Sequence, residues 1–201
     1  MLVYGMRYTT TLWTWGIISL LTLAAWQKKN TDDTFITFAS RAMQDVLPPM
    51  IKTLQAKVDK DGYAASVNFC AGFAGEHGKT KSSEWSEKAA QEIGAKTFRF
   101  RRISERNRNP QNTADARQTE ILASWQKHGA KPTIYRGGSQ IFTMHPIKIP
   151  MPMCLGCHGD EKTLDKKAVM EIKRLYPNDR ATGYKVGDLR GAFLTETTLR
   201  D

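Results

Sequence analysis

The feature that most constrains this chain is the run Cys-Leu-Gly-Cys-His at residues 154–158. Two cysteines separated by two residues and followed directly by a histidine are typical of covalent haem attachment. Each thiol can add to one vinyl group of the same porphyrin, and the histidine then places an imidazole nitrogen beneath the iron. We therefore predict one haem c, attached through Cys154 and Cys157, with His158 as an iron ligand, and call residues 154–158 the haem motif.

Three other interpretations of the motif fit less well. A zinc site would need a second pair of Cys or His ligands, and the chain has only one further cysteine, Cys70. A thioredoxin-like motif would follow an early strand of a βαβ unit. A disulfide across two residues would be short and strained. Gly156 and Gly159 are expected to let the backbone pass close to a flat macrocycle.

The N-terminal segment predicts a membrane anchor. Residues 8–27 carry no charge, and a bilayer is crossed by about 20 apolar residues. Trp13, Trp15 and Trp26 suit the membrane interface. A cleaved signal peptide is the alternative, but its apolar core is usually shorter. Because thioethers form outside the cytoplasm, we expect residues 1–29 to be a single-pass anchor in the inner membrane, with the haem domain on the periplasmic side.

Residues 30–62 are expected to form a helical stalk. Their apolar positions follow a period near 3.6, Pro48-Pro49 predicts a kink or break, and Asp61-Gly62 predicts an end. A helix packed on its own domain is an equally acceptable interpretation. Residues 63–201 then form the haem domain.

Position in the sequence alone does not identify the second iron ligand. Residues 63–77 form a helix of small apolar residues around Cys70, but a buried free cysteine often behaves as a small hydrophobe. His77 shares the face of Cys70 and is a rival candidate. Met144 and His145, like Met151 and Met153, lie near the haem motif in sequence.

The remaining chain alternates helices and strands. Residues 96–104 read as a half-buried strand with Phe98, Phe100 and Arg102 on one face, and a basic, Asn-rich loop follows at 106–112. Arginine pairs well with carboxylates, so Arg102 and Arg108 are candidates for contacts to the haem propionates. The elements that follow are a helix over 114–128 capped by Asn112 or Thr113, a hairpin over 132–145, a helix over 166–175 and a strand over 189–195.

The charge of the chain is +10. Its Lys and Arg residues are spread along the sequence, without the aromatic-interleaved patch of an RNA binder, so we expect no nucleic-acid partner. A basic surface can steer an acidic redox partner.

Several motifs together resemble the single-haem c-type cytochrome family with a PAS-like fold, known from cyanobacteria and many proteobacteria. The resemblance spans residues 30–197 and is carried by Arg102-Ile-Ser104, Arg108-Asn109-Pro110, Asn112, Glu120, Pro146-Ile147, the haem motif with Gly159, Tyr176-Pro177-x-Asp179-x-Ala181-Thr182-Gly183-Tyr184 and Gly187-Asp188-Leu189-Arg190-Gly191-Ala192. It implies an α+β, PAS-like fold, in which an antiparallel sheet has flanking helices. It also implies that His158 and Cys70 are the two axial iron ligands.

Two protein ligands leave no open position on the iron, so we expect no enzyme activity. The first functional hypothesis is a membrane-anchored, low-potential cytochrome that transfers electrons to a redox partner protein or serves as the haem subunit of a membrane complex. The second is a periplasmic redox or gas (NO, CO) sensor that signals through a partner. The third, a haem enzyme with an open iron, would require Cys70 to be absent from the metal.

Overall fold

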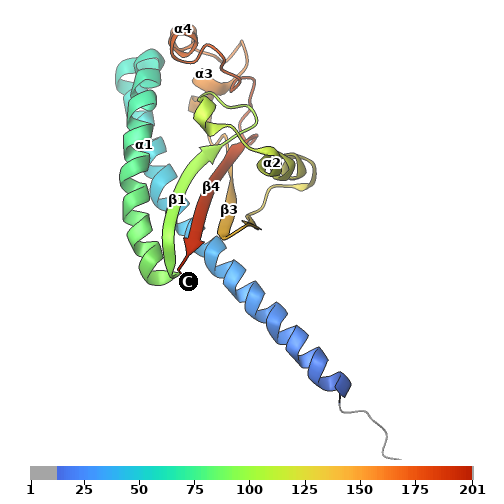
Figure 1. Cartoon of the computed structure of the whole chain (residues 1–201). Coiled ribbons are helices and arrows are strands. Elements are labelled where there is room, and N and C mark those ends of the chain that lie inside the picture. Colours follow the sequence, from blue (N-terminus) through green and yellow to red (C-terminus); the bar gives the residue numbers. More distant parts are fainter. Residues whose placement is uncertain (1–12, 201) are drawn as a thin grey trace, which may run out of the picture.

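The computed structural model describes the backbone of residues 13–200, and the side chains of residues 31–71 and 76–200. The described chain is an α+β fold in which helices flank a four-stranded antiparallel sheet, as predicted (Figure 1). Its elements are α1 (Trp13–Glu92), β1 (Ala95–Ile103), η1 (Pro110–Asn112), α2 (Ala116–His128), β2 (Thr133–Gly137), β3 (Gln140–Lys148), η2 (Pro152–Cys154), α3 (Leu155–His158), α4 (Lys166–Leu175) and β4 (Leu189–Leu199).

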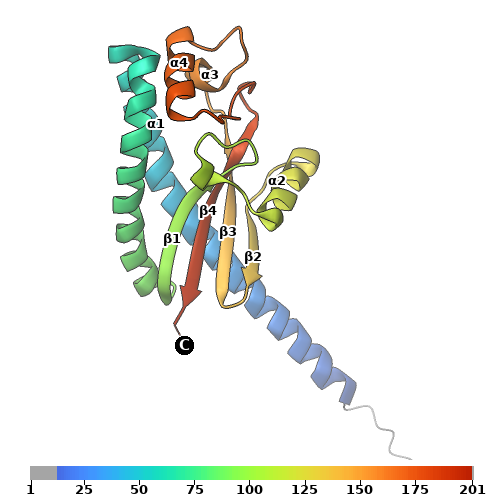
Figure 2. The same ribbon diagram turned by 45° about the horizontal axis from the view of Figure 1, so that its top comes forward.

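Helix α1 is a hairpin of two arms, residues 13–61 and residues 63–92, and the later part of the first arm runs beside the second arm and the sheet (Figures 1 and 2). The chain reverses at Gly62, whose φ of 78° and ψ of 176° are not helical. A positive φ is inexpensive only for glycine, so the predicted helix end at Gly62 is confirmed. Of the predicted kink or break at Pro48-Pro49, the break is wrong, because the first arm continues as a helix through both prolines. Val46 before them is buried in the core, and the Thr53 hydroxyl donates to the Pro49 carbonyl at 3.0 Å.

The strands follow the order β1-β4-β3-β2, with every neighbouring pair antiparallel. The expected hairpin is β2 and β3, joined at Gly137 and Gln140. Arg102 of β1 lies opposite Phe193 of β4, and Phe193 lies opposite His145 of β3. Residues that lie directly opposite each other in neighbouring strands point to the same face of the sheet. These three side chains therefore form one row across one face.

That face of the sheet packs against α1. Phe38 in the first arm of α1 meets the rings of Trp85 in the second arm and of Phe98 on β1 edge-on, with centroids 5.2 and 5.3 Å apart. Phe193 joins the same buried cluster. Residues 35–47 of the expected stalk therefore lie in the core of the domain, which is the alternative left open by the sequence pattern.

The opposite face packs against α2. Leu122 and Trp125 of α2 cover Ile103, Met144 and Leu194 of the strands. Helix α2 begins at Ala116, later in the chain than expected. Its N-cap is Asp115, whose side chain accepts from the backbone N–H of Gln118 in a capping box, rather than Asn112 or Thr113.

The expected membrane anchor lies partly outside the described residues. Residues 1–12 are not described, and the side chains of Trp13, Trp15 and Trp26 also lie outside the described part. The first arm of α1 projects beyond the end of the sheet before it reaches the core (Figures 1 and 2). Within the described chain, no helix combines the length and the apolar character needed to cross a membrane.

Candidate functional site

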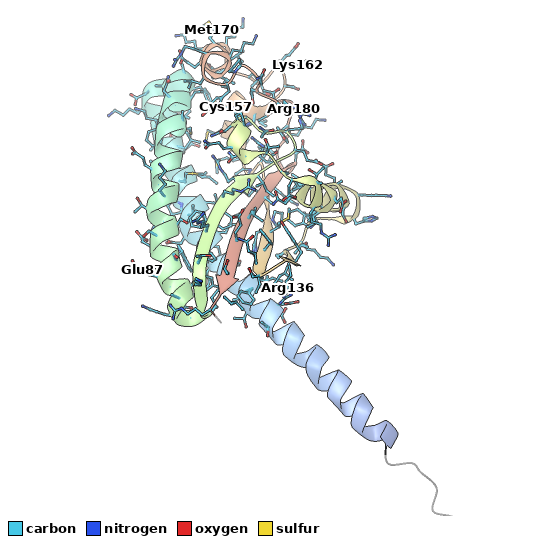
Figure 3. The ribbon with its side chains drawn as sticks, in the orientation of Figure 1. Glu87, Arg136, Cys157, Lys162, Met170 and Arg180 are labelled. Carbon is cyan, nitrogen blue, oxygen red and sulfur yellow. The ribbon has the colours of Figure 1, made fainter. Side chains whose placement is uncertain are left out.

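The haem motif occupies η2 and α3, at the end of the sheet where the α1 hairpin turns. Figure 3 shows Cys157 there, beneath α4 and beside the turn of the α1 hairpin. Cys157 packs with Tyr63 and Val67 of α1 and with Ala168 and Ile172 of α4. Each of the three cysteines of the chain is half-buried, and no disulfide joins them. The motif is therefore held between a helix far away in sequence and the short helix that follows it.

His158 is oriented by a single hydrogen bond. Its Nδ1 lies 2.7 Å from the carbonyl oxygen of Ala181. A carbonyl only accepts, so Nδ1 carries the proton and Nε2 keeps the lone pair that a metal requires. Burial lowers the pKa of His158 well below its ordinary value of 6.5, and the positive charges of Arg108 and Arg190 lower it further. The imidazole is therefore neutral, which is the protonation state of an iron ligand.

The loop at residues 179–184 wraps the end of α3. The backbone N–H of Tyr184 donates to the His158 carbonyl at 2.9 Å, and that of Gly183 donates to the Gly159 carbonyl at 2.6 Å. The Asp179 carboxylate accepts from the Ala181 N–H at 2.9 Å. These bonds fix the Ala181 carbonyl that orients His158, so the loop acts on the imidazole through the backbone.

Arg108 joins this loop to the haem motif. Its Nη2 donates to the Cys157 carbonyl at 2.5 Å and pairs with the Asp179 carboxylate at 3.1 Å. Its Nε is buried and has no hydrogen-bond partner among the described residues. Arg108 therefore holds two parts of the site together and retains one donor for a further acceptor.

Cys70 on the second arm of α1 lies within electrostatic range of Cys157, Arg102 and Arg108. Burial raises the pKa of the Cys70 thiol above its ordinary value of 9.0, while the two arginines act in the opposite direction. Burial also raises the pKa of Cys157 to about 11. A metal binds the thiolate, so the two guanidinium groups favour the form of Cys70 that can be a ligand.

Arg102 lies on the α1-facing side of β1 and is exposed. No ion pair of Arg102 is found among the described residues. Although the residue as a whole is exposed, its guanidinium is desolvated by burial, which lowers its pKa, while the Cys70 sulfur acts in the opposite direction. Its guanidinium is therefore available to an anionic group close to Cys70.

The other ligand candidates lie in different places. His145 is fully buried on the α1-facing side of the sheet, and its Nε2 has no partner in the described chain. Burial lowers the pKa of His145 to about 4. Met144 is fully buried against α2, on the opposite face of the sheet from Arg102. His77 is half-buried on the second arm of α1, two turns beyond Cys70.

Gly156 of the haem motif and Gly159, the residue after it, are closely approached by other parts of the protein, and their predicted approach to a macrocycle stays a prediction. A Cβ on Gly156 would overlap the ring of Tyr63, and one on Gly159 would overlap the side chain of Thr163. Both glycines therefore allow protein groups to approach closely, and Tyr63 covers the motif from the α1 side.

The donor set fits the predicted haem. The two thiols of the motif are separated by two residues, a neutral imidazole presents Nε2, and a third thiol on another element lies within electrostatic range of Cys157. Arg102 and the buried Nε of Arg108 supply positive charge for carboxylates. The structure thus brings together Cys70, Arg102, Arg108 and the haem motif.

A model of the Tll0287-like family matches residues 27–197, which include every residue of this site. The chain belongs to the Tll0287-like family.

The crystal structure of the cyanobacterial heme-protein Tll0287 is similar to this chain, with 20% sequence identity and a TM-score of 0.46. The similarity covers 77% of this chain and 98% of that chain. No curated protein matches the chain.

Within this Tll0287-like chain, sequence reasoning missed the positioning residues. Asp179 and Ala181 lie in the run that carried the resemblance, but their contacts to Arg108 and His158 depend on the fold. The sequence marks Tyr63 only as part of an apolar helix. Asp179 could have been found from the sequence, because it is the acidic residue between Tyr176-Pro177 and Gly183 in the run that carries the resemblance.

Proposed function

We propose that this protein is a membrane-anchored c-type cytochrome with one haem, attached through Cys154 and Cys157 and ligated by His158 and Cys70. When bound, such a haem supplies one-electron exchange between ferric and ferrous iron. The protein's role would be to carry electrons to a redox partner protein, or to serve as the haem subunit of a membrane complex.

One observation carries the proposal. His158 follows two attachment thiols directly, and its Nδ1 is bonded to the Ala181 carbonyl, which leaves Nε2 for a metal. Ligating histidines usually donate their other ring N–H to a carbonyl or carboxylate in this way. A histidine with no metal role would have little need for a neutral, fixed tautomer beside two thiols. The cyanobacterial protein Tll0287 is a heme-protein, and the proposal gives this chain the same kind of cofactor.

Cys70 is proposed as the second iron ligand because its sulfur lies on another element and within electrostatic range of Cys157. A thiolate donates electron density to iron and stabilises the ferric state, so the potential would be low. Arg102 and Arg108 lie near the same sulfur and would offset the negative charge of the thiolate and of the propionates. If His158 and Cys70 both held the iron, no position would be left for a substrate, so a role in electron transfer is favoured over turnover of a small molecule.

The location follows from the same chemistry. Thioether attachment takes place outside the cytoplasm, and residues 8–27 are uncharged over a length close to that of a bilayer. We therefore propose a single-pass anchor within residues 1–29, with a PAS-like haem domain on the periplasmic side of the inner membrane.

Electron paramagnetic resonance of the ferric protein tests the ligands. Wild type should give a low-spin thiolate spectrum, and C70A should lose it. Variants H77A and H145A serve as matched controls, because each removes an alternative ligand, and both should keep the wild-type spectrum. An unchanged C70A spectrum would exclude the thiolate, and a change in H77A or H145A would identify the ligand instead.

Covalent attachment is tested separately. Haem should stay with the denatured polypeptide in acidified organic solvent, and substitution of both Cys154 and Cys157 by Ala should release it. A colourless purified protein would exclude the whole proposal.

A sensor role is the second candidate, and the position of Cys70 favours it. Cys70 lies on the second arm of α1, so a haem held by Cys70 would be tied directly to this helix. The same helix reverses at Gly62 and continues as the first arm toward the N-terminus. If Cys70 held the iron, exchanging it for NO or CO, or losing it on reduction, would release the second arm of α1 and give the signal a route to a partner. Spectra unchanged by reductant, CO and NO would exclude this role.

A further inference from the structure

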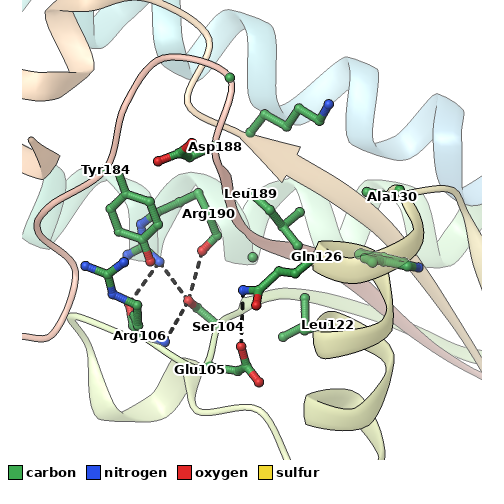
Figure 4. Close-up of a pocket in the computed structure, with 15 residues that line it drawn as sticks. Ser104, Glu105, Arg106, Leu122, Gln126, Ala130, Tyr184, Asp188, Leu189 and Arg190 are labelled. Atoms are coloured by element: carbon green, nitrogen blue, oxygen red, sulfur yellow. Dashed lines mark hydrogen bonds between the residues drawn. The ribbon is translucent and has the colours of Figure 1, made fainter.

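A pocket lies on the α2 side of the sheet, next to the loop that orients His158. Its volume is about 420 Å³, within the range of small-molecule sites. Its walls come from the end of β1, the last turns of α2, and the start of β4 with the residues before it (Figure 4). The haem motif and α1 contribute nothing to these walls, so the pocket is separate from the proposed haem site.

One end of the pocket is polar and is built around Arg190. Its Nη1 donates to the Ser104 hydroxyl oxygen at 2.9 Å and to the Arg106 carbonyl at 3.1 Å (Figure 4). Ser104 in turn donates to the Arg190 carbonyl at 2.9 Å, which fixes the arginine from both ends. No acidic side chain forms an ion pair with Arg190 within the described chain, so Nε and Nη2 keep their donors.

Arg106 adds a second guanidinium to this end. It donates to the carbonyls of Arg180 and Thr182 and stacks on the Tyr184 ring, 4.3 Å from its centroid. Arg190 lies 5.4 Å from the same centroid. Two fixed guanidinium groups on one aromatic ring form a preorganised site for an anion.

The net charge of the side chains that line the pocket favours a ligand with one negative charge. Arg106, Lys148 and Arg190 are basic, and Glu105 and Asp188 are acidic, so one positive charge is uncompensated. Asp188 already accepts from the Lys185 N–H at 2.8 Å, and Glu105 accepts from the Gln126 amide at 3.5 Å. These two carboxylates would repel a dianion such as phosphate more strongly than a monoanion.

The other end of the pocket is apolar. Leu122 and Trp125 of α2 line it together with Ala130 and Leu189. Figure 4 shows Leu122 and Leu189 across the pocket from Tyr184 and Arg106. We propose that this pocket binds a small amphipathic monocarboxylate, with its carboxylate on Arg190 and its apolar part against Leu122 and Trp125.

Binding of an anion in this pocket would change the electrostatic environment of His158. Tyr184 lines the pocket and meets the His158 ring edge-on, with centroids 6.4 Å apart. The charge of Arg190 also reaches His158. An anion on Arg190 would offset that charge and make the imidazole a stronger donor. The occupancy of the pocket itself does not depend on the proposed haem function.

Isothermal titration calorimetry of the full-length holoprotein with sodium phenylacetate tests the proposal. Wild type should bind one equivalent saturably, and phenylacetamide, the neutral analogue, should bind at least about tenfold more weakly, since it lacks the charge-assisted bonds. R190Q should lose a similar factor. A130F, which fills the apolar end, should also weaken binding and decides the matter if R190Q does not fold. R99Q is the matched control, because Arg99 lies further back along β1 and outside the pocket.

Several results would overturn the proposal. These are an absence of saturable binding at millimolar phenylacetate, equal affinity for phenylacetamide, tighter binding of inorganic phosphate, or variants R190Q and A130F that bind as wild type does. The calorimetric result is independent of haem ligation, so failure of the pocket and failure of the haem proposal are distinguishable. A shift of the haem potential on saturation, absent in R190Q, would be the second readout.

Discussion

Asp179 is expected to be the acidic residue on which the haem site depends most. It pairs with Arg108 at 3.1 Å, and only 9% of the Asp179 side chain and 15% of the Arg108 side chain are exposed. Removing one partner of a buried pair leaves the other charge without compensation, at a cost of about 3–5 kcal/mol. Because some exposure remains, we expect D179N to lower the free energy of unfolding by about 3 kcal/mol.

A second substitution separates the two roles of the carboxylate. Asp179 also accepts from the Ala181 N–H at 2.9 Å, and the side-chain oxygen of asparagine can keep that bond. D179A loses it and should cost about 1 kcal/mol more than D179N. The exposed pair Arg117–Glu120, whose side chains are 64% and 71% exposed, offers a matched control. E120Q should change stability by less than about 0.5 kcal/mol.

Urea unfolding of the holoprotein, followed by circular dichroism, measures these differences. A double-mutant cycle with R108M should give a coupling energy above about 1 kcal/mol, since both residues share one contact. The reasoning fails if D179N unfolds within about 0.5 kcal/mol of wild type, the value expected for a surface pair.

Three further predictions concern packing and pH. G156A should lower stability by about 1–3 kcal/mol because its methyl group overlaps the Tyr63 ring, and Y63L should recover part of that loss in melting experiments. F38A should cost about 3–5 kcal/mol in urea unfolding, whereas M170A, at a site 65% exposed, should cost little. Burial lowers the pKa of His145 to about 4, so the unfolded state binds the proton first, and stability should fall by roughly 3 kcal/mol between pH 6.5 and pH 4. Variant H145L should flatten that profile.

Each of these has a contrary outcome. Equal melting temperatures for G156A with and without Y63L would mean that Tyr63 does not pack on the glycine. A loss below about 1 kcal/mol in F38A would argue that residues 30–47 are a stalk rather than core. A pH profile in H145L as steep as in wild type would assign the acid sensitivity to another group.

The sequence by itself determined the local elements and predicted the chemistry of the haem motif. Helix α4 begins and ends where the pattern predicted, at Lys166 and Leu175. In β1, Phe98 and Phe100 lie on the same face of the strand, as predicted. These features depend on periodicity and on caps such as Asp165, which act over a few residues. The turn at Gly62 could also be predicted from the local sequence, because its positive φ suits glycine.

Only the tertiary structure decided which distant groups meet. The choice between a stalk and a core helix for residues 35–47 depended on whether a sheet formed later in the chain would cover Phe38. The passage of α1 through Pro48 and Pro49 likewise depended on packing that local propensity does not include. The fixed tautomer of His158 needs a carbonyl 23 residues away, and the approach of Cys70 to Cys157 needs the hairpin to reverse beside α3. Sequence patterns report interactions between near neighbours, whereas these contacts exist only after the chain has folded back on itself.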